Sequence, residues 1–209
     1  ETPLQSHPLE QRLSATVKTV ILPSLYLPPA EIFLQLKDVD EIVIAEDDSW
    51  EKQTLRSRCQ ILGANGVQTL SIPVKHTGGV RKPVKDITIS YSEAWVRIHK
   101  GAIFSAYNTS SFFTYFREDL FAIYDQQPKF LVDFNRQLLQ LVLRKLKLNI
   151  KINALSNNDN IIDLKEYTNL EKVKSQLTPI PPYPQVFSYK TPFQPTLSIL
   201  DLLSNKGGW

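Results

Sequence analysis

The spacing of apolar and polar positions predicts a strand, a helix and a second strand at the start of the chain. Residues 19–25 (TVILPSL) form a short β-branched run, which is typical of a strand. Pro28 and Pro29 suit a helix entry, and apolar side chains then recur at helical spacing over residues 31–39. A second β-branched run (EIVIAE) covers residues 41–46. We therefore expect a βαβ unit whose two strands are parallel.

The next segments alternate between apolar and polar positions, which is typical of antiparallel strands. They cover residues 55–62, 67–74 and 86–91. The run Gly63-Ala64-Asn65-Gly66 between the first two predicts a hairpin turn. It lacks the spacing of a phosphate-binding loop, so we assign it no ligand.

The second half of the chain predicts mainly helices. In residues 129–147, apolar side chains at intervals of three and four residues form a stripe that we expect to pack on the sheet. Ser92 can cap the first of these helices. The expected elements are helices at 93–107, 111–124 and 129–147, a strand at 148–154 and a polar helix at 163–176.

Together these elements predict a single α/β (mixed α+β) domain. Its N-terminal βαβ unit and antiparallel strand extension would form a mixed sheet, on which three to four helices pack. We expect a flexible N-terminal tail at residues 1–17 and the domain itself at 18–178. The proline cluster Pro179–Pro184 breaks regular structure. Residues 179–209 are therefore predicted to be an extended tail, docked on the domain because several of its side chains are apolar.

Composition excludes several classes of protein. The chain has 209 residues, 42% of them hydrophobic, which is enough for a sizeable core. Its net charge of +3 with interspersed acidic residues does not indicate a nucleic-acid partner. No apolar run approaches the roughly 18 residues that span a bilayer, so we expect no membrane insertion. A single cysteine, Cys59, and the lack of paired Cys/His spacing predict no disulfide, no metal site and a cytoplasmic location.

Several ordered segments resemble the WbqC-like protein family. They are TVILPSLYLPP, EIVIAEDDSWEKQTLRSRCQI, LSIPVKH, WVRIHKGAIFSAY, SFFTYF, DFNRQLL and, near the end, TPFQPTLSILDLLSNKGG. The resemblance implies a bacterial protein encoded with O-antigen or capsule genes. It also implies a glycyl or aminoacyl transferase that acts on an amino-sugar nucleotide. No cofactor or oligomeric state follows from the pattern.

Two groups of polar residues could serve such chemistry. Asp47 and Asp48 follow a predicted parallel strand, where open α/β sheets bind ligands, and either could orient or deprotonate an amine. The alternative is a solvated turn. Strand alternation would put Arg56 and Arg58 on one face, where their guanidinium groups suit a diphosphate or carboxylate and Lys52 and Lys75 add charge. The alternative is a solvated strand face.

A histidine and a cysteine are the remaining reactive candidates. His99 shares a helical face with Trp95 and could be the general base, or it could be a packed core histidine. Cys59 has aliphatic predicted neighbours, which favours a buried structural thiol over a nucleophile paired with His99. His76 is expected to be a loop residue.

The aromatic residues leave two functions open. Tyr107 and the nearby Phe112, Phe113 and Tyr115 could stack on a sugar or base ring, although core packing also explains them. With Trp95 and the cations above, they predict a site for a small-molecule substrate such as a nucleotide sugar. One hypothesis is therefore an acyl or aminoacyl transferase with His99, Asp47 or Asp48 as base. The other is a non-catalytic protein that binds a nucleotide sugar or carbohydrate.

Overall fold

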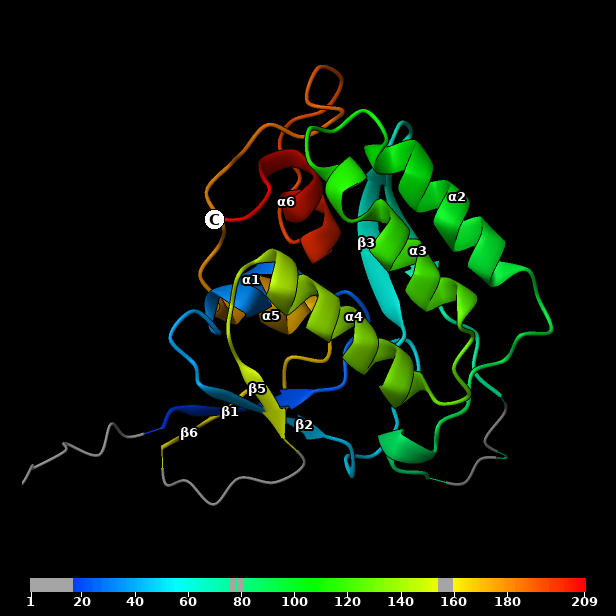
Figure 1. The fold of residues 1–209 in the computed structure, drawn as a ribbon, viewed down its shortest axis with the longest axis vertical. Coiled ribbons are helices and arrows are strands. Elements are labelled where there is room, and N and C mark those ends of the chain that lie inside the picture. The colour runs from blue at the N-terminus through cyan, green and yellow to red at the C-terminus, as the bar shows by residue number, and fades with distance from the viewer. Residues whose placement is uncertain (1–16, 76–77, 79–80, 154–159) are drawn as a thin grey trace, which may run out of the picture.

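The core of the molecule is a parallel sheet built around the predicted βαβ unit. A computed structural model describes residues 17–75, 78, 81–153 and 160–209. Strands β1 (Thr19–Pro23) and β2 (Glu41–Ala45) pair in parallel, with Val20 opposite Ile42, and α1 (Ala30–Leu34) connects them. This confirms the βαβ prediction. The short strands β5 (Lys151–Asn153) and β6 (Ile161–Asp163) add to its edges in the order β5-β2-β1-β6 (Figure 1).

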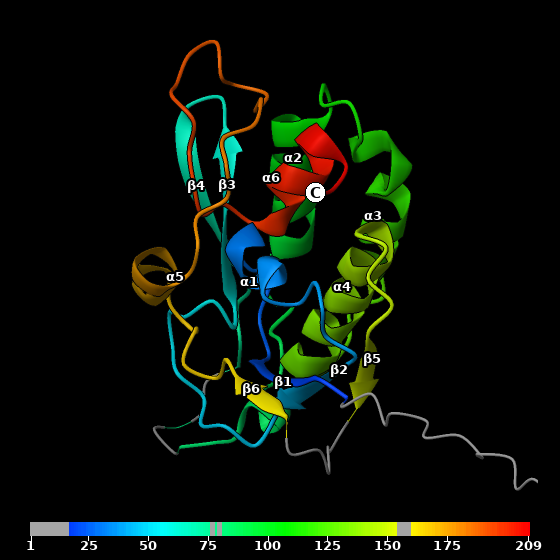
Figure 2. The ribbon, with the colours of Figure 1, turned by 90° about the vertical axis from the view of Figure 1, so that its left-hand side faces the viewer.

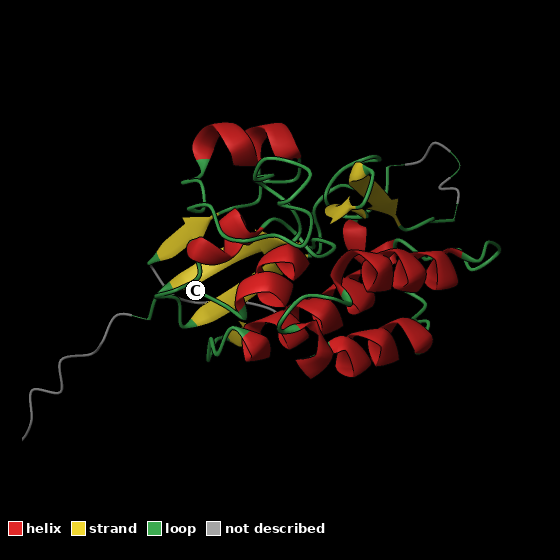
Figure 3. Ribbon diagram, turned by 90° about the horizontal axis from the view of Figure 1, so that it is seen from above, coloured by secondary structure: helices red, strands yellow, loops and turns green. Residues whose placement is uncertain are grey.

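A β-hairpin forms a second, separate sheet. Strands β3 (Arg58–Gly63) and β4 (Gly66–Ser71) pair antiparallel, and the connecting turn lies where the sequence predicted it. Figure 3 shows the hairpin apart from the parallel strands. The mixed α/β fold class is thus confirmed, although the parallel and antiparallel strands form two separate sheets rather than one mixed sheet. The third expected antiparallel strand does not form, because the backbone N–H of Ile89 bonds to the carbonyl of Lys129 and leaves only isolated bridges.

Three helices follow in the predicted order. They are α2 (Trp95–Tyr107), α3 (Arg117–Asp125) and α4 (Leu131–Lys145), with the 3₁₀ turns η1 (Val84–Asp86) and η2 (Phe113–Tyr115) before α2 and α3. Ser92 does not cap α2: the cap position is Ala94, and the Ser92 hydroxyl bonds to that of Ser90. The apolar stripe of α4 is buried as predicted.

The end of the chain contains a buried helix, although the sequence predicted an extended tail. Helix α6 (Ile199–Lys206) packs against α1, α2, β3 and η2, and its residues Ile199–Ser204 are buried (Figure 2). Asp201 holds this segment in place by accepting hydrogen bonds from Tyr183 Oη (2.7 Å) and Gln185 Nε2 (2.8 Å). The predicted polar helix is reduced to α5 (Leu170–Gln176), because Asp163 ends β6 and residues 164–169 form a turn and loop before the helix begins.

Candidate functional site

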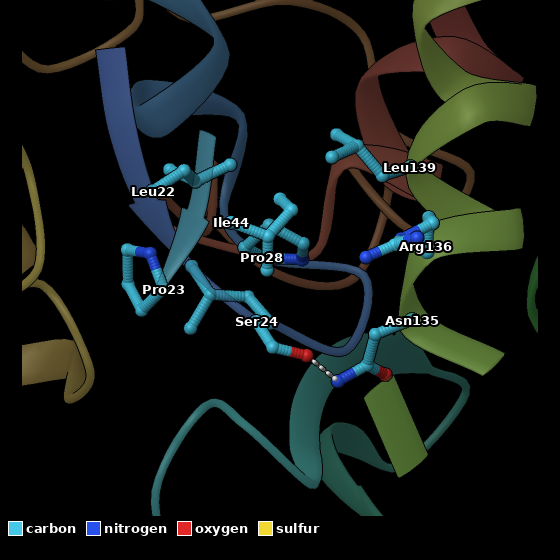
Figure 4. Close-up of a pocket in the computed structure, with 9 residues that line it drawn as sticks. Leu22, Pro23, Ser24, Pro28, Ile44, Asn135, Arg136 and Leu139 are labelled. Carbon is cyan, nitrogen blue, oxygen red and sulfur yellow. Dashed lines mark hydrogen bonds between the residues drawn. The ribbon is translucent and has the colours of Figure 1, made fainter. Parts of the chain in front are cut away.

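Polar side chains gather where strands β1 and β2 end at their carboxyl edge. Ser24 follows β1 directly, and Glu46 follows β2. Helix α4 packs over the same edge and brings Asn135 and Arg136 to it, beside Leu139 (Figure 4). Arg136 forms an ion pair with Glu46. The carboxyl edge of a parallel sheet is the usual ligand position in α/β proteins.

Asn135 is the hub of this group. Its Nδ2 donates to Ser24 Oγ (3.1 Å; Figure 4) and also to the backbone carbonyl of Arg56 (2.9 Å). Its Oδ1 is buried and has no hydrogen-bond partner among the described residues. The cavity beside it measures only about 10 Å³, which is on the order of the space one water needs. The group therefore fixes the backbone of Arg56 rather than enclosing a ligand.

A larger cavity, which we call the charged cavity, lies between the end of β2 and the segment that follows β6. Its volume is about 450 Å³. Its charged lining residues are the cations Arg56, Arg81, Lys165 and Lys172 and the carboxylates Asp48, Glu51 and Glu166. Such a lining suits a ligand that carries both phosphate or carboxylate oxygens and an amine or hydroxyl groups.

Arg56 and Asp48 form an ion pair in the lining of the charged cavity. Arg56 Nη2 lies 3.3 Å from Asp48 Oδ2, and the arginine is 3% exposed. Burial lowers the pKa of the Arg56 guanidinium, while the charges of Asp48 and Glu51 oppose that shift. The Arg56 Nε atom is buried without a hydrogen-bond partner among the described residues. The structure thus brings two of the predicted site residues together.

A second cavity, which we call the tryptophan cavity, contains three more of the predicted residues. Its volume is about 340 Å³, and Lys52, Arg58, Trp50 and Trp95 line it. Arg56 and Arg58 therefore line different cavities, contrary to the expected common strand face. The reason is that β3 begins only at Arg58, so strand alternation does not extend back to Arg56.

The other predicted substrate and base residues lie away from both cavities. Asp47 has an 85% exposed side chain, which pairs with Lys85 at 2.5 Å. Lys75 is exposed and lines neither cavity. Tyr107 is fully buried and packs against Phe113, which fits the core reading for these two rings, whereas Phe112 and Tyr115 of the same cluster are exposed. His76 lies outside the described residues.

His99 belongs to a buried hydrogen-bond network. Its Nδ1 lies 2.9 Å from the hydroxyl of Tyr26, which also bonds to the hydroxyl of Tyr124. Burial lowers the pKa of His99 to about 4, partly opposed by the backbone of Ser71. The ring is 3% exposed and lines neither cavity. Because it is neutral and enclosed, this geometry favours the structural reading over that of a general base.

Cys59 is buried beside the same network. Its side chain is 1% exposed, and burial raises the pKa of the thiol well above its ordinary value. A thiol held neutral at neutral pH is a poor nucleophile. The geometry thus supports the structural reading of this cysteine.

The sequence did not identify Ser24, Glu46, Asn135, Arg136 or Trp50 as part of the site. One signal was present: Asn135 is an amide on the otherwise apolar stripe of α4. Ser24 and Asn135 are 111 positions apart, so only the folded chain reveals their contact.

The described ranges contain neither a metal-binding cluster nor a membrane-spanning helix. No group of three or more His, Cys, Asp or Glu side chains is placed there to hold a metal ion. None of the helices in those ranges is both long and apolar enough to cross a membrane.

The fold and the polar carboxyl edge define a mixed α/β protein with ligand-sized cavities. Residues 24–178 match the model of the WbqC-like protein family, and the chain belongs to that family, which is linked to polysaccharide-biosynthesis genes. It is also similar to "Uncharacterized protein Rv1507c" of Mycobacterium tuberculosis, with 26% identity over 136 residues. That match covers 65% of this chain and 58% of the relative's length. No solved structure matches the chain.

Proposed function

We propose that the protein transfers an acyl or aminoacyl group to the amine of an amino-sugar nucleotide for bacterial surface-polysaccharide synthesis. The charged cavity would bind this acceptor. The family's link to polysaccharide genes supports the pathway class. Such nucleotides are cytoplasmic metabolites, so we place the protein in the cytoplasm, where the single cysteine Cys59 stays reduced.

The observation that carries the proposal is the ion pair between the buried Arg56 and the half-buried Asp48 at the carboxyl end of β2. The guanidinium group, with Lys165 and Arg81 in the same cavity, supports binding of a phosphate-bearing ligand. We assign the proton-accepting role to Asp48, because it follows β2 at the carboxyl edge of the sheet beside Arg56 and its side chain is still 30% exposed. Acceptor phosphates would also compete for Arg56 and release Asp48.

The reaction itself needs a base but no protein nucleophile. The acceptor nitrogen attacks the carbonyl carbon of an activated acyl donor, and a C–N bond forms. The donor's leaving group departs with the electron pair of the broken bond. The proton lost by the amine passes to Asp48. Deprotonation and orientation of the amine are therefore the roles we assign to this chain.

A second candidate function is binding of a nucleotide sugar or carbohydrate without turnover. It is favoured by the existing ion pair of Asp48, because a carboxylate already engaged by the Arg56 guanidinium is not free to meet an amine. The enclosed position of His99 also favours it, because that ring cannot replace Asp48 without moving.

The test compares two neighbouring aspartates. The purified protein is incubated with amino-sugar nucleotides and with aminoacyl or acyl thioesters, and N-acylated product is measured by mass spectrometry. Asp48→Asn should retain acceptor binding and reduce turnover by about 100-fold or more, within the usual range for a lost general base. Asp47→Asn, which alters an exposed carboxylate outside the cavity, should leave turnover unchanged. Equal turnover in both variants would refute the role of Asp48, and acceptor binding without product from any donor would support the binding protein.

A further inference from the structure

The segment between β2 and β3 separates the two cavities and contributes side chains to both. Ser49 and Glu51 line the charged cavity, whereas Trp50 and Lys52 line the tryptophan cavity. We propose that the tryptophan cavity is a separate subsite for the nucleoside phosphate part of a substrate. The inference rests on the proposed function only for the identity of that substrate.

The cations of the tryptophan cavity are available for a ligand. Neither Lys52 nor Arg58 has an ion-pair partner among the residues that the structure describes. In the charged cavity, by contrast, Arg56 is paired with Asp48. Glu93 also lines the tryptophan cavity, but it forms no ion pair with either cation within the described ranges. Two free cations beside one carboxylate favour an anion, and the fork of Arg58 suits phosphate oxygens.

The indole of Trp50 supplies a surface for a flat ring. This side chain is half-buried, and its Nε1–H has no hydrogen-bond partner in the described part of the chain. Trp95 forms the floor: it is 3% exposed and its Nε1 donates to the carbonyl of Ser90 (3.0 Å). A base of any kind can stack on an aromatic side chain through its π-face. A free phosphate would not use the indole, and a neutral sugar would not use the cations, so the combination indicates a nucleoside phosphate.

A third cavity adjoins the two sites. It measures about 250 Å³ and shares Asn169 with the charged cavity and Gln53 and Arg58 with the tryptophan cavity. A nucleoside phosphate in the tryptophan cavity could thus belong to the amino-sugar nucleotide whose sugar and sugar-linked phosphate lie in the charged cavity. It could equally belong to an acyl donor such as coenzyme A. Both sources present the same chemistry to Lys52 and Arg58.

Tryptophan fluorescence tests the subsite directly. The chain has three tryptophans, and Trp209→Phe removes the one at the C-terminus, leaving the two that line the cavity. Uridine diphosphate or coenzyme A should quench this fluorescence saturably. Uridine alone and pyrophosphate alone should each bind at least tenfold more weakly, because each lacks half of the recognised group.

Two lysines provide a matched pair of variants. Lys52→Gln should weaken nucleotide binding by about fivefold to tenfold, whereas Lys75→Gln, an equally exposed lysine outside both cavities, should leave it unchanged. Trp50→Leu should weaken binding at least tenfold when measured by calorimetry, which does not depend on the fluorophore. Circular dichroism controls for folding. Equal effects of the two lysine variants, or no saturable quenching by either nucleotide, would overturn the proposal.

The outcomes also separate this inference from the proposed function. If uridine diphosphate quenches and coenzyme A does not, the subsite belongs to the amino-sugar nucleotide. If coenzyme A quenches and uridine diphosphate does not, the subsite belongs to the acyl donor. Saturable quenching without acyl transfer would refute the transferase and leave the subsite standing. Acyl transfer without quenching would refute the subsite and leave the transferase standing.

Discussion

The buried state of His99 predicts how the stability of the protein depends on pH. An unfolded histidine has a pKa near 6.5, whereas the folded value is about 4 because burial disfavours the cation. Between these pH values the unfolded chain binds more protons than the folded one. The contribution of His99 to stability is therefore complete above about pH 6.5 and is lost as the pH falls toward 4.

The size of this effect follows from the pKa difference. Each unit corresponds to about 1.4 kcal/mol, so a shift from 6.5 to about 4 amounts to roughly 3 kcal/mol. Little solvent screening is expected because the side chain is 3% exposed. His99→Gln removes the titrating ring but keeps an acceptor that the Tyr26 hydroxyl can use. The variant should lose stability at pH 7 through imperfect packing, but this cost should not depend on pH.

The assay is urea unfolding of the wild type and His99→Gln at pH values from 4 to 8. The unfolding free energy of the wild type minus that of the variant should fall by about 3 kcal/mol between pH 7 and pH 4. Taking this difference removes the titration of carboxylates that both proteins share. A difference that stays constant within about 1 kcal/mol would show that the ring is hydrated in the native state, and the structural reading of His99 would then be wrong.

Three further predictions concern other buried polar groups. Asn135→Ala should lower the unfolding free energy by about 1–3 kcal/mol, because the Ser24 hydroxyl and the Arg56 carbonyl lose their donor. Gln140→Ala, on the exposed face of α4, should change the unfolding free energy by less than about 0.5 kcal/mol. Urea unfolding of both variants checks this prediction. Iodoacetamide should label Cys59 slowly in the native protein and rapidly in urea, and fast native labelling would contradict its raised pKa. Burial raises the pKa of Asp201, so the contribution of this group to stability should fall as pH rises above the unfolded value of about 4, and the unfolding free energy of the wild type minus that of Asp201→Asn should be smaller at pH 7 than at pH 4. Asp201→Asn, which keeps an acceptor for Tyr183, should not show that loss in unfolding at pH 4 and 7.

The parts of the fold that were predictable are those whose pattern is local. Residues 19–25 and 41–46 carry β-branched runs, and their strands form in parallel around α1 as expected. Strand β6 was missed because three residues are too few to show alternation, and it forms only because β1 offers a free edge. Helix α6 was missed because it follows a proline-rich segment, although Ser198 and Gly207 provide an N-cap and a left-handed C-cap.

Site residues that follow the end of a strand were predictable from the sequence. Site residues whose direction depends on where a strand begins were not. Asp48 was expected near the carboxyl end of β2, and it lines a cavity there. Arg56 was assigned to the same face as Arg58, but turns precede β3 and direct the two side chains to different cavities. The contribution of Asn135 required knowledge of where α4 crosses the sheet, which is a tertiary property.

Arg56 couples the stability of the site to its chemistry. Its backbone carbonyl is held by Asn135 of α4, and its side chain is paired with Asp48 in the charged cavity. Removing the guanidinium would therefore leave a partly buried carboxylate without its partner as well as remove a ligand contact, so lost activity could not be assigned to either cause. Lys52 lies in the same segment but is exposed and free of ion pairs among the described residues. Ligand recognition can thus be tested at Lys52 without disturbing the core, whereas a change at Arg56 alters stability and ligand binding together.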